Sequence, residues 1–404
     1  MTPRGLLRRH GGGHAAVSNL ELFFDLVYVF AITQISQFMR THLDVAGLAE
    51  AVLLFLAVWW AWIYTSWATN WANPETVPVR VMLVFVMLAS LVLAAVLPRA
   101  FDGDHHALVF ALTYGALQFG RNLFMVWAMA GDNPSGSRNM ARIAMWFVFS
   151  APFWLAGALV ATRGGQFALW SVALTIEYAG PFAFFRVPGL GRSTAQDWDI
   201  SGSHMAERAS LFVLIALGEG IVVTGAAFAE AVPDMERTLA FLAAFASSVL
   251  MWWIYFDIGA ERGARYIARS DDVGRIARNA YTYLHMPIVG GVIAAAVADA
   301  LLMARPDAVA GPALIAACGG GLGGFLISLA LFKRMSSPLG NPPLSHGIGL
   351  LLLIALCASA RLVGWTATGF TMACDGALLV VVVWEWGSFH GGWRERFRGW
   401  GLPV

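Results

Sequence analysis

The sequence predicts an all-α membrane protein with about twelve transmembrane helices, arranged as two parallel six-helix repeats. Three observations lead to this prediction. Hydrophobic residues make up 58% of the 404 residues, charged residues only 13%, and the mean hydropathy is +0.66, whereas a soluble protein has about 25% charged residues. Apolar runs long enough to cross a bilayer recur along the whole chain. Arginine residues are distributed unevenly between alternate loops.

The apolar runs have about 20 residues each, which is the length that crosses roughly 30 Å of hydrocarbon. They lie near residues 20–39, 45–68, 78–97, 106–130, 140–161, 167–185, 208–230, 237–258, 277–303, 311–332, 345–364 and 368–387. With a cytoplasmic N-terminus, nineteen of the 26 Lys and Arg residues fall on the cytoplasmic side. Short cytoplasmic loops retain basic residues. The asymmetry therefore favours twelve spans in a bacterial inner membrane, with both termini cytoplasmic.

Short matches between the two halves predict the internal repeat. The tripeptide Trp-Ile-Tyr occurs at 62–64 and again at 253–255, and the segments around Glu177 and Glu385 are also similar. Because six is an even number of spans, the second repeat enters the membrane in the same orientation as the first. The predicted boundaries are residues 1–19 for a cytoplasmic tail, 20–185 for the first repeat, 186–207 for a cytoplasmic linker, 208–387 for the second repeat and 388–404 for a cytoplasmic C-terminal tail.

Two acids in the first span, Glu21 and Asp25, are the most informative charged residues. Their spacing of four places them on one helical face, which they share with Tyr28 and Ser36. A charge in the middle of a membrane costs roughly 2.5 to 3.5 kcal/mol on insertion scales, so an intramembrane acid indicates a functional site. The acids therefore require a partner.

The fourth span offers such a partner. Tyr114, Gln118, Arg121 and Asn122 lie on one face at helical spacing. Arg121 lies in the cytoplasmic half of its span, as Asp25 does. We therefore expect Asp25 and Arg121 to form an ion pair that offsets part of both desolvation penalties. The alternative is that such a pair only fixes the register of the two helices.

The second half of the chain adds further candidates. His204 and Glu207 lie at the cytoplasmic start of the seventh span, and Glu219 lies about half-way across it. An acid in the first turn complements the helix dipole, which explains Glu207 but leaves Glu219 unexplained. In the ninth span Tyr281 and His285 share a face, and a histidine can relay protons near neutral pH.

Other features of the sequence argue against cofactors. The repeated Glu and Glu-x-x-His set of carboxylate di-metal proteins is missing, so we expect no metal and no other cofactor. The glycine-rich run 318–324 lies inside an apolar span without a following Lys-Ser/Thr pair, which indicates close helix packing and not a phosphate loop.

Pro287 removes a backbone donor from the ninth span and should loosen its hydrogen bonds one turn earlier.

Four segments carry a resemblance to a known family. They are residues 19–34, residues 204–208 with 217–220, residues 252–257 and residues 281–287. Over nearly its whole length the chain closely resembles the bacterial low-temperature-requirement A family. The resemblance implies a class of membrane protein without a settled biochemical activity. This family often has His-Gly where this chain has Ala209-Ser210. A role of the family's histidine therefore cannot be assigned to this chain.

A fainter resemblance concerns the first span alone. The Phe-x-Asp-x-Val pattern at residues 23–27, followed by Ala-Ile-Thr at 31–33, is similar to the first-helix signature of potassium and proton channels built from six-helix repeats. Those channels have Phe-Ser-Asp where this chain has Phe-Phe-Asp, so a pore-lining role does not carry over. The resemblance agrees with a duplicated six-span layout.

Three functions compete at this point. The leading hypothesis is a proton-linked transporter or channel for an ion or small solute, which uses protonation of Asp25 or Glu219 and has Arg121 as a fixed counter-charge. The candidate residues for transport are Asp25, Glu21, Arg121, Gln118, Asn122, Glu219, Glu207, His204, His285 and Tyr281. We expect the lipid bilayer and the transported species as partners, a homodimer as an open option, and no nucleic acid because the net charge is only +1.

The second hypothesis is an intramembrane enzyme that acts on a lipid or isoprenoid, with Glu21, Asp25, Glu207 and His285 supplying general acid and base. No spacing typical of a nucleophile and its base supports it. The third hypothesis is a non-catalytic membrane component that supports growth at low temperature.

Overall fold

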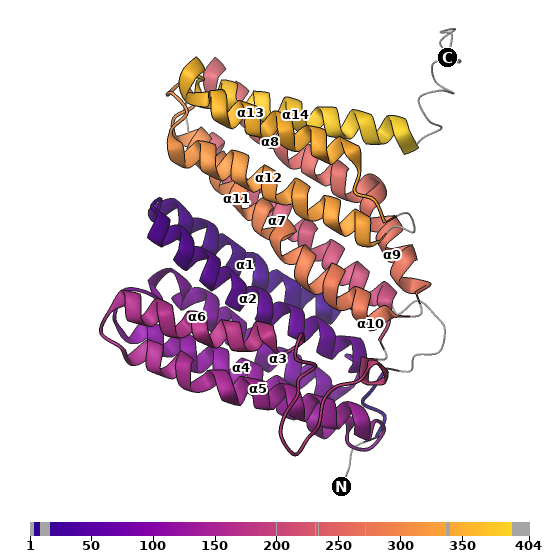
Figure 1. The fold of residues 1–404 in the computed structure, drawn as a ribbon. Helices are drawn as coiled ribbons and strands as arrows, with labels where there is room; N and C mark the ends of the chain where they lie inside the picture. The colour runs from indigo at the N-terminus through magenta and orange to yellow at the C-terminus, as the bar shows by residue number, and fades with distance from the viewer. Residues whose placement is uncertain are drawn as a thin grey trace. The chain divides into compact units, whose positions relative to one another are not determined.

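A computed structural model of the chain describes residues 4–8, 17–198, 200–230, 232, 234–270, 272–336 and 340–389 (Figure 1). Nearly all of the predicted C-terminal tail and most of the predicted N-terminal tail lie outside the described residues. Within the described ranges the chain is helical, and the extended pairings there are isolated bridges. The predicted all-α class is therefore confirmed.

Nine helices of the described residues are long and apolar enough to cross a membrane. Six of them are single elements, namely Asn19–Thr41 (α1), Val45–Trp71 (α2), Pro134–Leu159 (α5), Gly202–Glu230 (α7), Met235–Tyr255 (α8) and Pro312–Met335 (α12). The span Val77–Arg99 combines α3 (Val77–Val96) with η1 (Leu97–Arg99), and the span Val273–Ala304 combines α10 (Val273–Ile276), η4 (Ala277–Leu284) and α11 (His285–Ala304). The ninth, Ala367–Ser388, lies within α14 (Ala367–Phe389). Their number and composition are those of a multi-pass membrane protein.

The other three predicted spans also form helices, each with a feature that sets it apart from the nine. Helix α4 (His105–Met129) carries the polar face of the fourth span, and α6 (Arg163–Ala179) has only 17 residues. Helix α13 (Leu344–Val363) has a shorter apolar part, Leu344–Ala360. Three short elements complete the described chain, namely η2 (Ala195–Trp198), η3 (Phe256–Ala260) and α9 (Glu261–Ala268).

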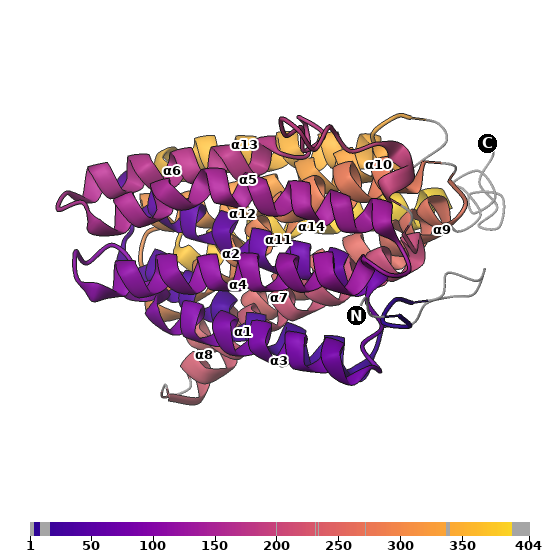
Figure 2. The same ribbon diagram turned by 90° about the horizontal axis from the view of Figure 1, so that it is seen from below.

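The chain divides into two compact units. Unit 1 comprises Met1–Ala209 and Ile267–Arg278. Helices α4, α5 and α6 lie side by side in it, α3 packs on α4, and α1 packs on α3 (Figures 1 and 2). Helix α2 contacts α1, α4 and α6, and its Trp59, Trp60 and Trp62 are fully buried. Helix α2 therefore forms the centre of unit 1, and residues 202–209 of α7 bring further side chains to it.

Unit 2 comprises Ser210–Tyr266 and Asn279–Val404. Its helices α11, α12, α13 and α14 pack each on the next, and α8 packs on α14 and α11. Helices α11 and α12 approach each other closely, because a β-carbon at Gly321 would lie 2.9 Å from the carbonyl oxygen of Gly291. The expectation that the glycine-rich run serves close helix packing is confirmed.

A widened helical turn, η4, directly precedes His285 in unit 2. Pro287 lacks the amide that would continue the regular hydrogen bonds one turn back, and the Nδ1 atom of His285 instead contacts the carbonyl oxygen of Ala280 at 2.8 Å. Turns of this kind occur often at functional sites. The predicted loosening of the helix before Pro287 is therefore confirmed.

Candidate functional site

A cluster of charged side chains is buried in unit 1, where α1, α2 and the start of α7 meet. We call Arg8, Glu21, Asp25, His204 and Arg208 the charge cluster. Glu21 and Asp25 lie one turn apart on α1, and both side chains are fully buried. The cluster thus places two acids, two arginines and a histidine in an apolar interior.

Glu21 is held by groups from three parts of unit 1. Its Oε1 lies 2.8 Å from Nε2 of His204, and its Oε2 lies 2.7 Å from Nη2 of Arg8. Oε2 also accepts a hydrogen bond from the backbone N–H of Ser18, with which Glu21 forms a capping box at the start of α1. One role of Glu21 is therefore structural, since it fixes the beginning of α1.

Asp25 has an asymmetric environment. Its Oδ1 accepts hydrogen bonds from Nη2 of Arg208 and from Nε1 of Trp62, both at 2.8 Å. Its Oδ2 is buried and has no hydrogen-bond partner among the described residues. An unsatisfied buried acceptor costs about 1 to 3 kcal/mol. One oxygen of this carboxylate is thus fixed and the other is free to take a proton.

Arg208 links the two acids. It donates to the carbonyl oxygen of Glu21 at 2.8 Å and to Oγ of Ser66 at 3.3 Å, in addition to Asp25. Its guanidinium carbon lies 5.4 Å from the ring centre of Phe24 and 5.9 Å from that of Trp62. These rings exclude water, and the ion pairs are correspondingly strong.

The orientation of His204 follows from its neighbours. The backbone N–H of Ser201 donates to Oδ1 of Asn70 at 2.8 Å, which turns the amide nitrogen of Asn70 toward Nδ1 of His204 at 3.2 Å. Nδ1 therefore accepts, and Nε2 carries the proton that faces Glu21. If His204 were doubly protonated, its Nδ1–H donor would face the NH₂ donor of Asn70. Protonation of this histidine thus breaks one of its contacts.

The predicted ion pair between Asp25 and Arg121 is wrong. Arg121 donates to the carbonyl oxygen of Ala61 and to Oγ1 of Thr65, each at 3.2 Å, and to Oε1 of Gln118. Helix α2, which packs on α1 and on α4, supplies the first two of these partners. Arg208 of α7 occupies the place beside Asp25 instead. Asp25 is nevertheless buried and not exposed at a headgroup layer.

The polar face of α4 is buried as predicted, but it serves another acid. Tyr114 donates to Oε2 of Glu177 at 2.5 Å, and Ser150 and Trp154 donate to Oε1 at 2.7 and 2.8 Å. A cavity of about 200 Å³ lies beside this group, lined mainly by apolar side chains of α4 and α5. Gln118 reaches the same cavity, whereas Asn122 bonds to the carbonyl oxygen of Gln118 at 2.7 Å.

Of the other predicted residues, Glu207 belongs to unit 1 and the rest belong to unit 2. Glu207 accepts a hydrogen bond from the N–H of Val17 at 3.3 Å, and Glu219 is buried in unit 2. In unit 2 Tyr281 stacks on His285 with ring centres 4.9 Å apart. Nε2 of His285 accepts from the hydroxyl of Tyr255 at 2.8 Å, since its Nδ1 donates to a carbonyl.

Several residues of the site were not predicted. Asn70, Trp62 and Ser66 are neutral, and no spacing in the sequence singles them out. Arg208 was counted among the cytoplasmic arginines. Asp299 and Asp375, buried acids of unit 2, carry the same signal that pointed to Asp25, an acid within an apolar span.

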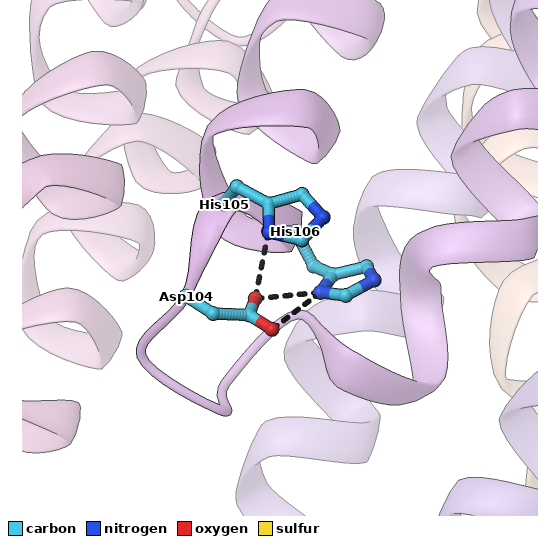
Figure 3. Close-up of side chains that lie close together, drawn as sticks. All are labelled: Asp104, His105 and His106. Carbon is cyan, nitrogen blue, oxygen red and sulfur yellow. Dashed lines mark hydrogen bonds and ion pairs between the residues drawn. The ribbon is translucent and has the colours of Figure 1, made fainter.

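Asp104, His105 and His106 form an exposed group at the start of α4 (Figure 3). The carboxylate of Asp104 caps the helix by accepting from the backbone N–H of His106 at 2.7 Å, and it also contacts Nδ1 of His106. The backbone N–H and the His106 ring hold the pKa of Asp104 below its usual value. The group is explained by helix capping.

Comparisons with known proteins agree with the resemblance stated above. The family model described as bacterial low temperature requirement A protein (LtrA) matches residues 16–383. An uncharacterized protein of Rhizobium meliloti is 38% identical over 381 residues, which cover 94% of this chain and 91% of that protein. No solved structure matches the chain.

Proposed function

The chain belongs to the bacterial low temperature requirement A family, and we propose that it is a proton-linked transporter or channel for an ion or small solute. The observation that carries the proposal is Asp25, a fully buried carboxylate with one oxygen held by Arg208 and the other without a partner among the described residues. Intramembrane acids with a named counter-charge mark proton and ion pathways. Arg208 takes the role of fixed counter-charge.

Protonation of Asp25 gives the site two states. A proton on Oδ2 removes the negative charge, so the attraction between Asp25 and Arg208 weakens. Arg208 then keeps its bonds to the carbonyl oxygen of Glu21 and to Ser66. Arg208 then takes a second position, in which it is bound to α1 through Glu21 and to α2 through Ser66 but released from Asp25. Coupling between protonation and transport requires an element with two such states.

The relay toward Asp25 starts at the end of the cluster that is nearer to water. Arg8, whose side chain is 14% exposed, contacts Glu21, and Glu21 contacts His204. His204 keeps Nδ1 as the acceptor of the Asn70 amide and donates the proton on its Nε2 to Oε1 of Glu21, so it orients Glu21 for a proton that arrives from the Arg8 end. Glu21 lies one turn before Asp25, so the route runs along α1.

The membrane layout that accompanies this function has twelve spans, two parallel repeats and cytoplasmic termini in the bacterial cell membrane. The nine apolar helices, together with α4, α6 and α13, correspond one by one to the predicted spans. The order of packing supports the repeat, because the last four long helices pack in succession in both units. The second helix of each unit also packs on the last, as α2 does on α6 and α8 on α14.

The test is proton flux in vesicles that contain the purified full chain. Wild-type protein should carry a proton current across the vesicle membrane when an ion gradient is imposed. A pH-sensitive dye inside the vesicles measures this current. Asp25→Asn keeps the hydrogen bonds of Oδ1 but takes no proton, so we expect it to abolish the current. Arg208→Lys should reduce it, since lysine has one donor nitrogen and lacks the planar fork whose two nitrogens reach Asp25 and Glu21.

A matched control is Glu50→Gln. Glu50 is a buried acid of unit 1 paired with Arg163, away from the charge cluster. This variant should keep the current, which separates loss of a buried ion pair from loss of the proton site. Equal currents in wild-type and Asp25→Asn vesicles, with both proteins folded by circular dichroism, would exclude the proposal.

A second candidate function is favoured by the cavity of about 200 Å³ beside Glu177. Its apolar walls and single carboxylate fit a small amphiphile, as the hypothesis of an intramembrane enzyme on a lipid or isoprenoid requires. The acids named for that chemistry, Glu21 and Asp25, do not line the cavity. Product formed from a labelled polyprenyl or phospholipid substrate by the purified protein would support this function over transport.

A further inference from the structure

Unit 2 contains two buried acids that the proposed proton path does not use. Asp299 on α11 is 2% exposed and Asp375 on α14 is 7% exposed. The two helices pack together, so unit 2 buries two acids of like charge on neighbouring helices. Like charges in an apolar interior destabilise each other unless a positive charge lies between them.

Among the residues that the structure describes, neither acid finds that positive charge. Oδ1 of Asp375 accepts a hydrogen bond from Oγ of Ser247 on α8. Oδ2 of Asp375 and Oδ2 of Asp299 are buried and have no hydrogen-bond partner within the described ranges. No ion pair there joins either acid to a basic side chain. Two free carboxylate oxygens in one apolar region require an explanation.

A glycine of α7 lies beside one of these oxygens, that of Asp299. A β-carbon at Gly220 would lie 3.2 Å from Oγ of Ser248 and 3.4 Å from Oδ2 of Asp299. Ser248 and its neighbour Ser247 are both buried on α8. The hydroxyl of Ser248 and the free oxygen of Asp299 therefore border the same position, which no side chain of α7 fills.

The helix ends near these residues are tied together. The backbone N–H of Ala310, after α11, donates to the carbonyl of Trp365, and that of Ala367, at the start of α14, donates to Ala308. Asp299 lies near the C-terminal end of α11 and Asp375 in the first half of α14. These loop contacts hold the two acids at the same end of unit 2.

We propose that Asp299, Asp375, Ser247 and Ser248 form a binding site for one hard divalent cation, with Ca²⁺ as the best match. All four ligands are oxygens, which hard cations prefer and soft metals do not. Two carboxylates balance the charge of one divalent ion. Ca²⁺ tolerates irregular geometry and completes its shell with water or carbonyl groups, whereas Mg²⁺ demands a near-octahedral site.

The inference does not depend on transport, because its test measures binding. The full chain is purified in detergent, stripped with a chelator and titrated with ⁴⁵Ca²⁺, while melting temperatures are recorded with Ca²⁺, Mg²⁺, Na⁺ or Zn²⁺. Wild-type protein should bind Ca²⁺ saturably and melt at a higher temperature with it. Asp299→Asn and Asp375→Asn should lose both responses. Ser247→Ala keeps both charges, covers the case in which an Asn variant does not fold, and should weaken binding by about tenfold.

Glycine variants provide the matched control. Gly220→Ala puts a methyl group between Ser248 and Asp299, and we expect it to weaken Ca²⁺ binding by about tenfold or more. Gly218→Ala and Gly225→Ala change the same helix where a β-carbon would meet nothing within 4 Å, so they should bind as wild type does.

Three results would overturn the proposal. One is wild-type protein that binds no Ca²⁺. Another is Ca²⁺ binding that survives in both Asn variants and in Ser247→Ala. The third is a response to Zn²⁺ alone, which would assign the site to the buried thiols Cys318 and Cys374 nearby.

Discussion

Glu177 on α6 and Glu385 on α14 are both buried carboxylates in similar sequence segments, yet their surroundings differ. Glu177 is held by three neutral donors, those of Tyr114, Ser150 and Trp154. Glu385 is held by a cation, because Nζ of Lys333 lies 2.7 Å from its Oε2 and 2.9 Å from its Oε1.

The difference separates two ways to bury a carboxylate. The Lys333–Glu385 pair is electrically neutral, and Lys333 also donates to the carbonyl of Ile254 at 3.0 Å, which ties α12 to α14 and α8. Neutral donors satisfy the oxygens of Glu177 but leave its charge in place beside a cavity. Similar sequence segments around two acids thus do not imply equal roles. We infer that Glu385 serves stability and that Glu177 remains able to respond to a ligand.

The largest effect is expected from Lys333→Met, because it leaves Glu385 buried without its counter-charge. Breaking a buried pair from one side costs about 3 to 5 kcal/mol, so thermal unfolding in detergent should begin at a much lower temperature. The double variant Lys333→Met with Glu385→Gln removes both charges and should recover much of the loss.

The control for this variant is Arg334→Met, the same kind of change at the adjacent exposed position. It should alter stability by less than about 0.5 kcal/mol. If Lys333→Met and Arg334→Met unfolded at the same temperature, Glu385 would not depend on its cation, and the contrast with Glu177 would disappear.

A smaller effect is expected from Glu177→Gln. The amide keeps the size of the side chain and one acceptor oxygen, but its NH₂ group then faces donors. We expect a loss of about 1 to 3 kcal/mol, the cost of leaving buried polar groups unsatisfied. Thermal unfolding monitored by tryptophan fluorescence measures it, with Glu75→Gln at an exposed position as the control. A loss as large as that of Lys333→Met would show that the charge of Glu177 is compensated after all.

The sequence predicted which residues share a buried helix face better than it predicted which residues bind each other. Helical spacing correctly indicated that Glu21, Asp25, Tyr28 and Ser36 share a buried face of α1, because the period of a helix is a local property. The partner of Asp25 is Arg208, which is 183 residues away along the chain. Arg208 and Arg121 agree equally well with the depth and the negative charge of Asp25, so these two properties do not distinguish between them.

Helix existence was predictable for the same local reason, since an apolar run of sufficient length has few alternatives in a bilayer. The neutral members of the site were not. Asn70 and Trp62 matter because of where their hydrogen bonds point, which depends on how α2 packs. Asp299 and Asp375 were within reach of sequence reasoning, because each is an acid within an apolar span, the pattern that identified Asp25.

The smallest effect is expected from Tyr114→Phe. This change removes one of three donors to Glu177 and leaves the ring in place, so the loss should be about 0.5 to 1.5 kcal/mol. In the Glu177→Gln background the same change should cost less, because the charged acceptor that strengthens the bond is gone. The difference between the two values is the coupling between Tyr114 and Glu177. Additive losses would mean that the hydroxyl is satisfied elsewhere, and the set of neutral donors that distinguishes Glu177 from Glu385 would then be reduced to Ser150 and Trp154.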